Sequence, residues 1–317
     1  MTDKEKYKAL CEIEESIPLF SQAWWLDSVC GDDYWDVCLV EKGDEIIASM
    51  PYLIKSRYGL KISTQPQLTQ NLGPWIRKSN AQYIKHLSNE KKILDALFSQ
   101  LPKFAHFNQN WHYKYVNWLP LYWLGYSQTT KYTYVIDNLL SKSNILRDFQ
   151  SSYRNKIKNS SKILYIKSGL DDDLFFEINK KTFERQNIKI PYTFDFYSNH
   201  SKAIRDNESG EIFYACDEHG NIHSALYLTW DSMSSYVHMV GEDPKYRSSG
   251  AGVLLIFHVI EYTKNKLKLN RFDFEGSMIE SIEKVRRGCS GIQTPYFSIS
   301  KTNSKILKIR NVLKEII

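Results

Sequence analysis

The residues of this sequence best suited to bind an anion lie in one short loop. The loop has the pattern Arg-x-x-Gly-x-Gly and consists of Arg247, Ser248, Ser249, Gly250, Ala251 and Gly252. An apolar run precedes it and a helix-like segment, 253–266, follows it. The first turn of a helix has unpaired backbone N–H groups at the positive end of the helix dipole, and glycines let a phosphate approach that backbone. We therefore expect a phosphate-binding loop; the alternative is an ordinary surface turn before a helix.

Side chains able to accept a proton stand at the end of the strand before this loop. They are His238, Glu242 and Asp243. Transfer of an acyl group to an amine or hydroxyl needs an aligned carbonyl, a place for developing negative charge and a route for the nucleophile's proton. We expect Glu242 and Asp243 to be catalytic candidates; capping or a salt bridge is the alternative role for each acid.

A second strand, 271–275, adds two more carboxylates. Its alternation puts Phe272 and Phe274 on one face and Asp273 and Glu275 on the other. If the phenylalanines pack in the core, both carboxylates face a cleft. Glu275 is accordingly a third catalytic candidate.

These residues need a strand, a loop, a helix and a second strand, in the order of a βαβ unit. Elsewhere two hairpins turn at Gly43 and Gly220, and an alanine stands five residues after each glycine, Ala48 and Ala225. Two hairpins of one design indicate a duplicated unit. The first copy has no Arg-x-x-Gly-x-Gly loop.

The length of 317 residues favours two domains. We expect an N-terminal domain at 1–140 without the phosphate loop and a C-terminal domain at 141–302 with it. A C-terminal helix, 303–317, is expected to pack back on the first domain. The fold class is α/β (α+β), with a twisted mixed sheet flanked by helices in each domain.

The net charge of +6 is concentrated in two places. Residues 141–167 hold seven basic side chains and one acidic one, and the tail from Lys301 is also basic. Such segments suit an anionic partner, such as coenzyme A, a nucleotide sugar, a lipid headgroup or tRNA. A solvated helix face is the alternative. Aromatic residues gather at 111–126, where they either pack under a sheet or stack on sugars or bases.

The five cysteines are odd in number and widely spaced, so they fit neither a disulfide framework nor a zinc site, and we expect no metal. The N-terminus lacks the apolar core of a signal peptide. No apolar run approaches the ~20 residues of a transmembrane helix. These features favour a cytoplasmic protein.

The loop at Arg247, Gly250 and Gly252 resembles the coenzyme A loop of the GNAT acyltransferases. With the duplicated hairpins, the whole chain resembles the Fem-type (FemAB-like) branch of that superfamily. The matching stretches are Pro18–Trp25, Asn71–Pro74, Tyr153–Lys158, Phe272–Ser277 and Ile282–Gly288.

This resemblance implies two tandem GNAT-like domains with a cleft between them, and a donor that is acetyl-CoA, another acyl-CoA or aminoacyl-tRNA. The acceptor would be a cell-envelope or polysaccharide precursor. A lysine near Gly288 stabilises the oxyanion in Fem-type enzymes, and Lys284, Arg286 and Arg287 compete for that role. The tyrosine acid of many GNAT enzymes has no match. The long coiled-coil insertion of some tRNA-using members is absent, which leaves tRNA use open.

We therefore expect an acyltransferase. The alternative is a non-catalytic module that holds a nucleotide sugar or glycan in a degenerate site.

Overall fold

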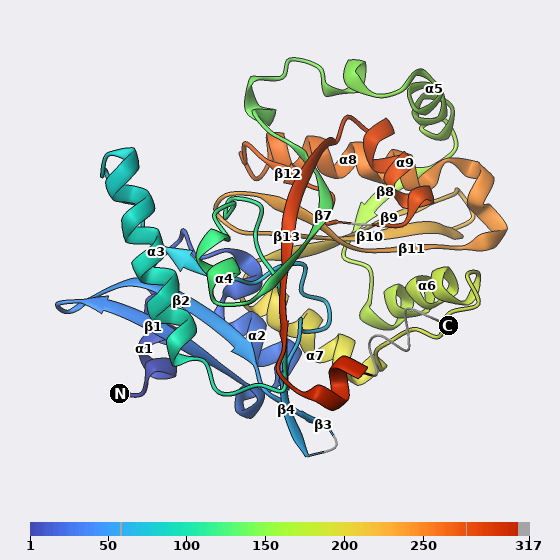
Figure 1. Cartoon of the computed structure of the whole chain (residues 1–317). Coiled ribbons are helices and arrows are strands. Elements are labelled where there is room, and N and C mark those ends of the chain that lie inside the picture. Colours follow the sequence, from blue (N-terminus) through green and yellow to red (C-terminus); the bar gives the residue numbers. More distant parts are fainter. Residues whose placement is uncertain (58, 277, 310–317) are drawn as a thin grey trace. The chain divides into compact units, whose positions relative to one another are not determined.

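The computed structural model describes residues 1–317 except 58, 277 and 310–317 (Figure 1). The chain divides into two compact units. Unit 1 is Met1–Lys131 together with the described chain from Pro295 onward, and unit 2 is Tyr132–Thr294. We expected boundaries after residues 140 and 302; the compact units divide after Lys131 and Thr294 instead.

Unit 1 contains two sheets and the helices that cover them. Its helices are α1 (Asp3–Ile13), α2 (Ala23–Cys30), α3 (Tyr83–Gln100) and α4 (Leu119–Trp123). One sheet has the order β1 (Trp35–Lys42), β2 (Glu45–Leu53), β5 (Trp75–Ile76), and all its pairs are antiparallel. The other has the order β3 (Lys55–Arg57), β4 (Leu60–Ser63), β6 (His106–Asn110), β13 (Ile292–Thr302).

Unit 2 contains one mixed sheet. Its strand order is β7 (Ser127–Ile136), β12 (Phe272–Asp273), β11 (Ser235–Glu242), β10 (Ile222–Trp230), β9 (Gly210–Cys216), β8 (Tyr165–Ser168). Only β11 and β12 pair in parallel within this series. Its helices are α5 (Ser151–Ser160), α6 (Asp172–Glu184), α7 (Phe194–Asp206), α8 (Ala251–Asn265) and α9 (Glu280–Gly288). The predicted α/β class, with mixed sheets and flanking helices, is confirmed.

Both units contain the same run of elements. A hairpin, β1–β2 or β9–β10, comes before a strand, a helix and a strand, which are β5–α3–β6 in unit 1 and β11–α8–β12 in unit 2. In unit 1 the short strands β3 and β4 are inserted between the hairpin and β5. Ala48 and Ala225, the alanines after the two turns, are both fully buried. The turn glycines Gly43 and Gly220 have positive φ angles, +63° and +80°, which explains glycine at these places.

The core of unit 2 lies between α8 and the central strands. Leu255, Val259 and Ile260 recur at helical spacing on α8 and are fully buried. Phe272 and Phe274 join the same core, so the predicted facing of these two rings is confirmed. The core thereby fixes which way Asp273 and Glu275 point.

Strands β7 and β13 each begin in one unit and end in the other. The last residues of β7 pair with β12 in unit 2, with Val135 opposite Asp273. The last residues of β13 pair with β6 in unit 1, with Ser298 opposite Asn110. After β13, the backbone N–H of Asn303 donates to Ala105 O at 2.9 Å. Residues 305–309 are helical, and the rest of the predicted C-terminal helix lies outside the described residues.

Candidate active site

The site begins where two parallel strands of unit 2 part. β11 and β12 pair only at Ser235–Phe272 and Tyr236–Asp273. β12 then ends, whereas β11 continues to Glu242. The side of β11 that faced β12 therefore has no strand neighbour beyond Tyr236. The polar side chains described next gather here.

His238 and Glu275 form a buried dyad at this place. His238 Nδ1 lies 3.0 Å from Glu275 Oε1, and their side chains are 1% and 13% exposed. A carboxylate oxygen accepts, so the imidazole N–H donates. Glu275 has φ +50°, a left-handed conformation that is unusual for a residue with a side chain and is often found at functional sites.

A second histidine continues the chain of polar groups. His200, from α7, places its Nε2 3.4 Å from His238 Nε2. Burial and the nearby His238 hold the pKa of His200 well below its ordinary value, so its ring is neutral at neutral pH. One of the two Nε2 atoms carries the hydrogen and donates to the other across this contact.

Asp273 lies fully buried behind the dyad. Its Oδ1 accepts from Thr133 Oγ1 at 2.6 Å and from the backbone N–H of Glu275 at 2.9 Å. Burial raises the pKa of Asp273 to about 7. The expectation that this carboxyl faces an open cleft is wrong, because Asp273 has no exposed surface.

Burial also raises the pKa of Glu275, while His238 and Arg286 partly offset the rise. The charge of Arg286 acts on Asp273 in the same direction. Of the three cations that we considered near Gly288, Arg286 is thus the one that reaches both carboxyl groups. Lys284 is exposed. Arg287 is 65% exposed and pairs with Glu283 at 2.8 Å.

The other two predicted catalytic acids are held in ion pairs. Glu242 Oε2 lies 2.9 Å from Arg185 and 3.7 Å from Arg247. Asp243 caps the short 3-10 helix Pro244–Ser249 through Lys245 N, and Lys181 Nζ lies 2.6 Å from it. Burial works against ionisation of Asp243, but Lys181 and the cap bring its pKa below the ordinary value. Such a group accepts protons poorly at neutral pH.

Gly250 begins α8 with φ +78°. A Cβ at this position would lie 2.4 Å from Ser160 Oγ, which itself donates to Ser249 O at 2.6 Å. Gly250 therefore makes room for α5. Packing against α5 therefore explains the glycine at this position, and no ligand is needed to explain it.

Gly252 lies on the open side of the loop. The nearest atom to a Cβ here would be Glu242 Oε1, at 3.6 Å. Ala251 N donates to Ser249 Oγ and Leu254 N to Gly250 O, and in the described chain Gly252 N and Val253 N have no hydrogen-bond acceptor. The side chain of Arg247 is 66% exposed. The backbone N–H groups and Arg247 favour an anion at Gly252, whereas the carboxylate of Glu242 on the same side acts against it.

The adjoining part of β11 is less open. Asn179 Nδ2 on α6 donates to Val240 O at 2.8 Å, and Glu242 N donates to Thr182 Oγ1 at 2.9 Å. A Cβ at Gly241 would lie 2.7 Å from Asn179 N. A donor arm that needs the backbone groups of Val240 and Glu242 does not fit here. The loop before α8 thus suits the phosphates of coenzyme A. The end of β11 suits the acyl-bearing arm of coenzyme A less well.

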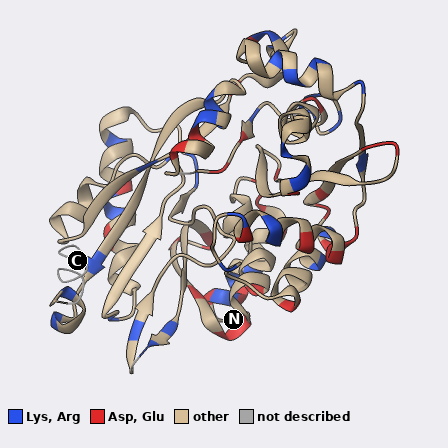
Figure 2. Cartoon of the chain, turned by 90° about the vertical axis from the view of Figure 1, so that its right-hand side faces the viewer, with Lys and Arg blue, Asp and Glu red and all other residues tan. Residues whose placement is uncertain are grey.

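The basic segment is only partly available to a ligand. Arg154 donates to the carbonyls of Arg147 and Phe149 at 2.9 and 3.0 Å, so it ties the start of α5 to the chain before it. Lys156 and Lys158 are exposed on α5 (Lys and Arg are blue in Figure 2). The Cβ of Lys156 is 3.5 Å from the Cβ position of Gly250, and its Nζ lies 5.8 Å from the ring centroid of Tyr153.

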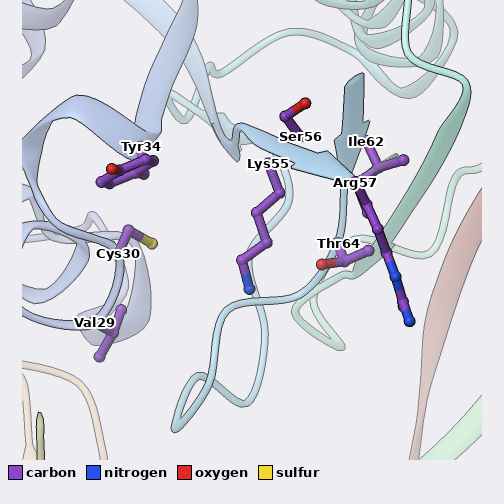
Figure 3. Close-up of a pocket in the computed structure, with 8 residues that line it drawn as sticks. All are labelled: Val29, Cys30, Tyr34, Lys55, Ser56, Arg57, Ile62 and Thr64. Atoms are coloured by element: carbon purple, nitrogen blue, oxygen red, sulfur yellow. The ribbon is translucent and has the colours of Figure 1, made fainter. Parts of the chain in front are cut away.

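Unit 1 has a pocket of its own (Figure 3). Its volume is about 470 Å³, and it is lined by Val29, Cys30, Tyr34, Lys55, Ser56, Arg57, Ile62 and Thr64. The ammonium group of Lys55 points into the space between Tyr34 and Thr64. Burial raises the pKa of the Cys30 thiol, so that side chain is neutral at neutral pH. The pocket combines cations with an aromatic ring and suits a small anion that has an apolar or ring portion.

Every helix among the described residues is too short or too polar to cross a bilayer. The same residues hold no cluster of three or more His, Cys, Asp and Glu side chains placed to bind a metal ion.

Residues 149–279, which include the loop and the His238–Glu275 dyad, match the family model described as acetyltransferase (GNAT) domain. This stretch is a GNAT domain. The GNAT domain covers most of unit 2 and ends before α9. No curated protein is significantly similar to the chain in sequence.

Solved structures share the fold over nearly the whole chain. FemX superposes with a TM-score of 0.66 at 12% identity, covering 94% of this chain and 96% of that one. L-PGS from Bacillus licheniformis gives 0.56 at 10% identity over 99% and 96%. A tandem GNAT protein from the clavulanic acid biosynthesis pathway gives 0.52 at 7% identity over 94% and 95%. These likenesses show the fold, and the tandem GNAT-like fold that the Fem-type resemblance implied is confirmed.

Several residues around the site were not predicted. Thr133, Asn179, Thr182 and His200 come from distant parts of the sequence and carry no local motif. Each is found only through the packing of its element against β11 or β12. The signal that could have indicated His200 is a histidine on the buried face of α7, beside Tyr197 and Ile204.

Proposed function

We propose that the protein transfers an acyl group to an amine or hydroxyl of an anionic acceptor, with Glu275 as the general base. The observation that carries this proposal is the His238–Glu275 dyad, placed where β11 and β12 part inside the GNAT domain. A carboxyl whose pKa is raised by burial can take a proton from a nucleophile near neutral pH.

His238 and Arg286 have supporting roles. The Nδ1–H of His238 holds Glu275 Oε1, so the other carboxylate oxygen takes the acceptor's proton. Arg286, whose charge reaches Glu275, stabilises the carboxylate between turnovers. A bound acyl donor supplies an activated carbonyl and a leaving group that departs with a proton. Glu275 returns the proton that it took, so the group ends the cycle ionised.

The donor's phosphates would lie at Gly252 and Lys156. The Gly252 and Val253 N–H groups, the helix dipole of α8 and the exposed Arg247 all favour an anion there. Acyl-CoA and aminoacyl-tRNA both present such phosphates. The bonds from Asn179 and Thr182 to β11 favour a donor that does not need the far end of this strand.

The unit 1 pocket, taken by itself, would bind an anionic ligand. Lys55 and Arg57 supply positive charge, and Tyr34 and Ile62 supply apolar contact. A precursor that carries a phosphate or carboxylate beside a sugar or peptide fits this composition. A cell-envelope or polysaccharide precursor is an acceptor of this type.

A non-catalytic binding module is the second candidate. The specific observation that favours it is the covered stretch at Val240 and Glu242, which narrows access for a donor. In such a module the unit 1 pocket would hold its ligand and the dyad would only support the fold.

One experiment separates the two. Purified protein is mixed with acetyl-CoA and UDP-glucosamine. The free thiol of released coenzyme A is measured by the absorbance that it produces with a chromogenic disulfide reagent. We expect turnover that falls at least ~100-fold in Glu275→Gln, because general-base catalysis contributes about that much. Glu177→Gln, at an exposed carboxylate on α6, is the matched control and should keep most activity.

Binding is measured beside turnover, by calorimetry with desulfo-CoA, with uncharged tRNA and with UDP-glucosamine. Donor binding without thiol release points to a different acceptor. If the protein binds UDP-glucosamine but neither desulfo-CoA nor tRNA, the acyltransferase proposal is wrong and the binding-module proposal is favoured.

A further inference from the structure

The surface that the site leaves unexplained is an apolar one on unit 1. Seven large apolar side chains are exposed there, and we call them the aromatic patch: Tyr83, Ile84, Val116, Leu119, Tyr122, Trp123 and Leu124. Their exposed fractions run from 40% to 78%. The aromatic cluster of the sequence therefore divides, since Trp111 and Leu121 lie in the core while this part faces solvent.

The patch spans the start of α3 and the whole of α4, and the two helices are tied together. Asn117 Nδ2, just before α4, donates to Glu90 Oε2 on α3 at 3.0 Å. Lys91 Nζ lies 4.7 Å from the ring centroid of Trp123. Tyr83 and Ile84 open α3 about two turns before Glu90.

Cations lie beside the patch, where Lys91 contacts the ring of Trp123. Between residues 80 and 126 there are five lysines and two acidic residues. One of these acids, Glu90, is already engaged by His86 at 3.2 Å and by Asn117. Lys301 adds a further cation, because its Nζ donates to Leu124 O at 2.7 Å. An apolar surface with cations beside it is complementary to a lipid layer, which has anionic headgroups above an apolar interior.

We infer that the aromatic patch docks on the surface of an anionic lipid bilayer. Trp and Tyr side chains favour the level of the lipid headgroups, and lysines are attracted to anionic lipids. Because no described helix can span a bilayer, the contact would be peripheral. It would bring the protein to lipid-linked molecules, and it holds whether or not the proposed transfer reaction does.

The positions of Tyr83 and Ile84 favour a bilayer over a rigid partner. Consecutive residues on a helix point about 100° apart, so one flat protein face buries only one of the two side chains. A helix end that enters a fluid headgroup layer buries both. The first turn of α3 has no side-chain cap, and its N–H groups are available to lipid phosphates.

The test uses the full chain and sedimentation with vesicles of equal parts phosphatidylglycerol and phosphatidylcholine at low salt. We expect wild type to pellet with these vesicles and to stay in solution with pure phosphatidylcholine. Tyr83→Ser with Ile84→Ser, and separately Trp123→Ser, should weaken partitioning about tenfold or more through lost apolar burial. Lys85→Ala with Lys91→Ala should weaken it less and reduce its salt dependence.

Ile13→Ser is the matched control, since Ile13 is 80% exposed in the same unit and lies outside the patch. Its partitioning should equal that of wild type. Circular dichroism confirms that each variant is folded. Wild type that stays in solution with anionic vesicles overturns the inference, as does an equal loss in Ile13→Ser. A dimer in solution that dissociates in Tyr83→Ser with Ile84→Ser would assign the patch to a second copy and also overturn it.

Discussion

Tyr153 occupies the space that a side chain at Gly288 would need. A Cβ on Gly288 would lie 2.4 Å from Cε2 of Tyr153, and Gln150 N donates to Gly288 O at 2.9 Å. The contact fixes the start of α5 against the end of α9. Both residues lie in stretches that resemble the Fem-type pattern, and the structure gives a packing reason for the pair.

Gly288→Ala should therefore destabilise the protein by about 1–3 kcal/mol through overpacking. Chemical denaturation of the single variants and of Gly288→Ala with Tyr153→Leu measures the coupling. We expect the double variant to recover most of the loss. Additive effects in the double variant would show that the two side chains do not compete for this space.

Asp273 should make stability depend on pH. Its pKa is raised to about 7 in the folded protein from 3.8, so the folded state holds a proton that the unfolded state releases over this interval. The contribution of Asp273 to the free energy of unfolding is fully present below pH ~4. It is lost as the pH rises toward 7, by up to about 4 kcal/mol.

Asp273→Asn should flatten that part of the profile, because the amide cannot ionise. The measurement is the free energy of unfolding from pH 4.5 to 8 for wild type and variant, at roughly half-unit steps. If the two profiles run parallel, Asp273 does not carry the dependence. Asp148→Asn, at a half-exposed ion pair with Lys142, is the control and should keep the wild-type slope.

The two loop glycines should respond differently to substitution. Gly250→Val meets Ser160 and a left-handed φ, so we expect lower stability whether or not a ligand binds. A Cβ at Gly252 meets Glu242 Oε1 at 3.6 Å and Ser224 Oγ at 4.0 Å, both ordinary contacts, so Gly252→Val should fold normally and lose anion binding. Calorimetry with acetyl-CoA and thermal unfolding measure the two effects.

Arg247→Ala should weaken the same ligand by roughly 1.5–3 kcal/mol, the range of hydrogen bonds to charged groups. Acetyl-CoA that binds Gly252→Val as well as wild type would move the anion site away from the loop.

Asn179 should matter more for stability than its polar side chain suggests. It accepts from Tyr192 Oη at 2.6 Å and donates to Val240 O at 2.8 Å. Asn179→Leu leaves both buried partners without this bond, at about 1–3 kcal/mol for each. Thermal unfolding should show a clear loss, whereas Asn155→Leu on exposed α5 should change little. A stable Asn179→Leu protein would mean that water or backbone movement satisfies these groups.

Local patterns predicted much of unit 2. The alternation in 271–275 placed Phe272 and Phe274 correctly because a strand has a period of two residues. The turns at Gly43 and Gly220 were predictable because glycine marks a positive φ. The loop before α8 was found from its glycines and its position after a strand.

Long-range packing decided the remainder. Gly250 was read as room for a ligand, but Ser160, ninety positions earlier in the chain, fills that room. The residue at which α9 begins decides which of its side chains face Glu275 and Asp273, and the sequence does not fix that residue. In the structure Arg286, rather than Lys284, acts on these carboxyl groups. His200 joins His238 only through the docking of α7, and no local signal encodes that contact.

The pairing of β13 with β6 has a consequence for synthesis on the ribosome. Unit 2 is one continuous stretch, whereas unit 1 is built from two stretches that flank it. The N-terminal residues emerge first, but the sheet that contains β6 lacks β13 until translation has passed Thr302. Domains usually fold in the order of their synthesis. Here unit 2, which emerges later, is the first to have all its strands synthesised. Until β13 emerges, β6 in the N-terminal segment lacks its β13 partner.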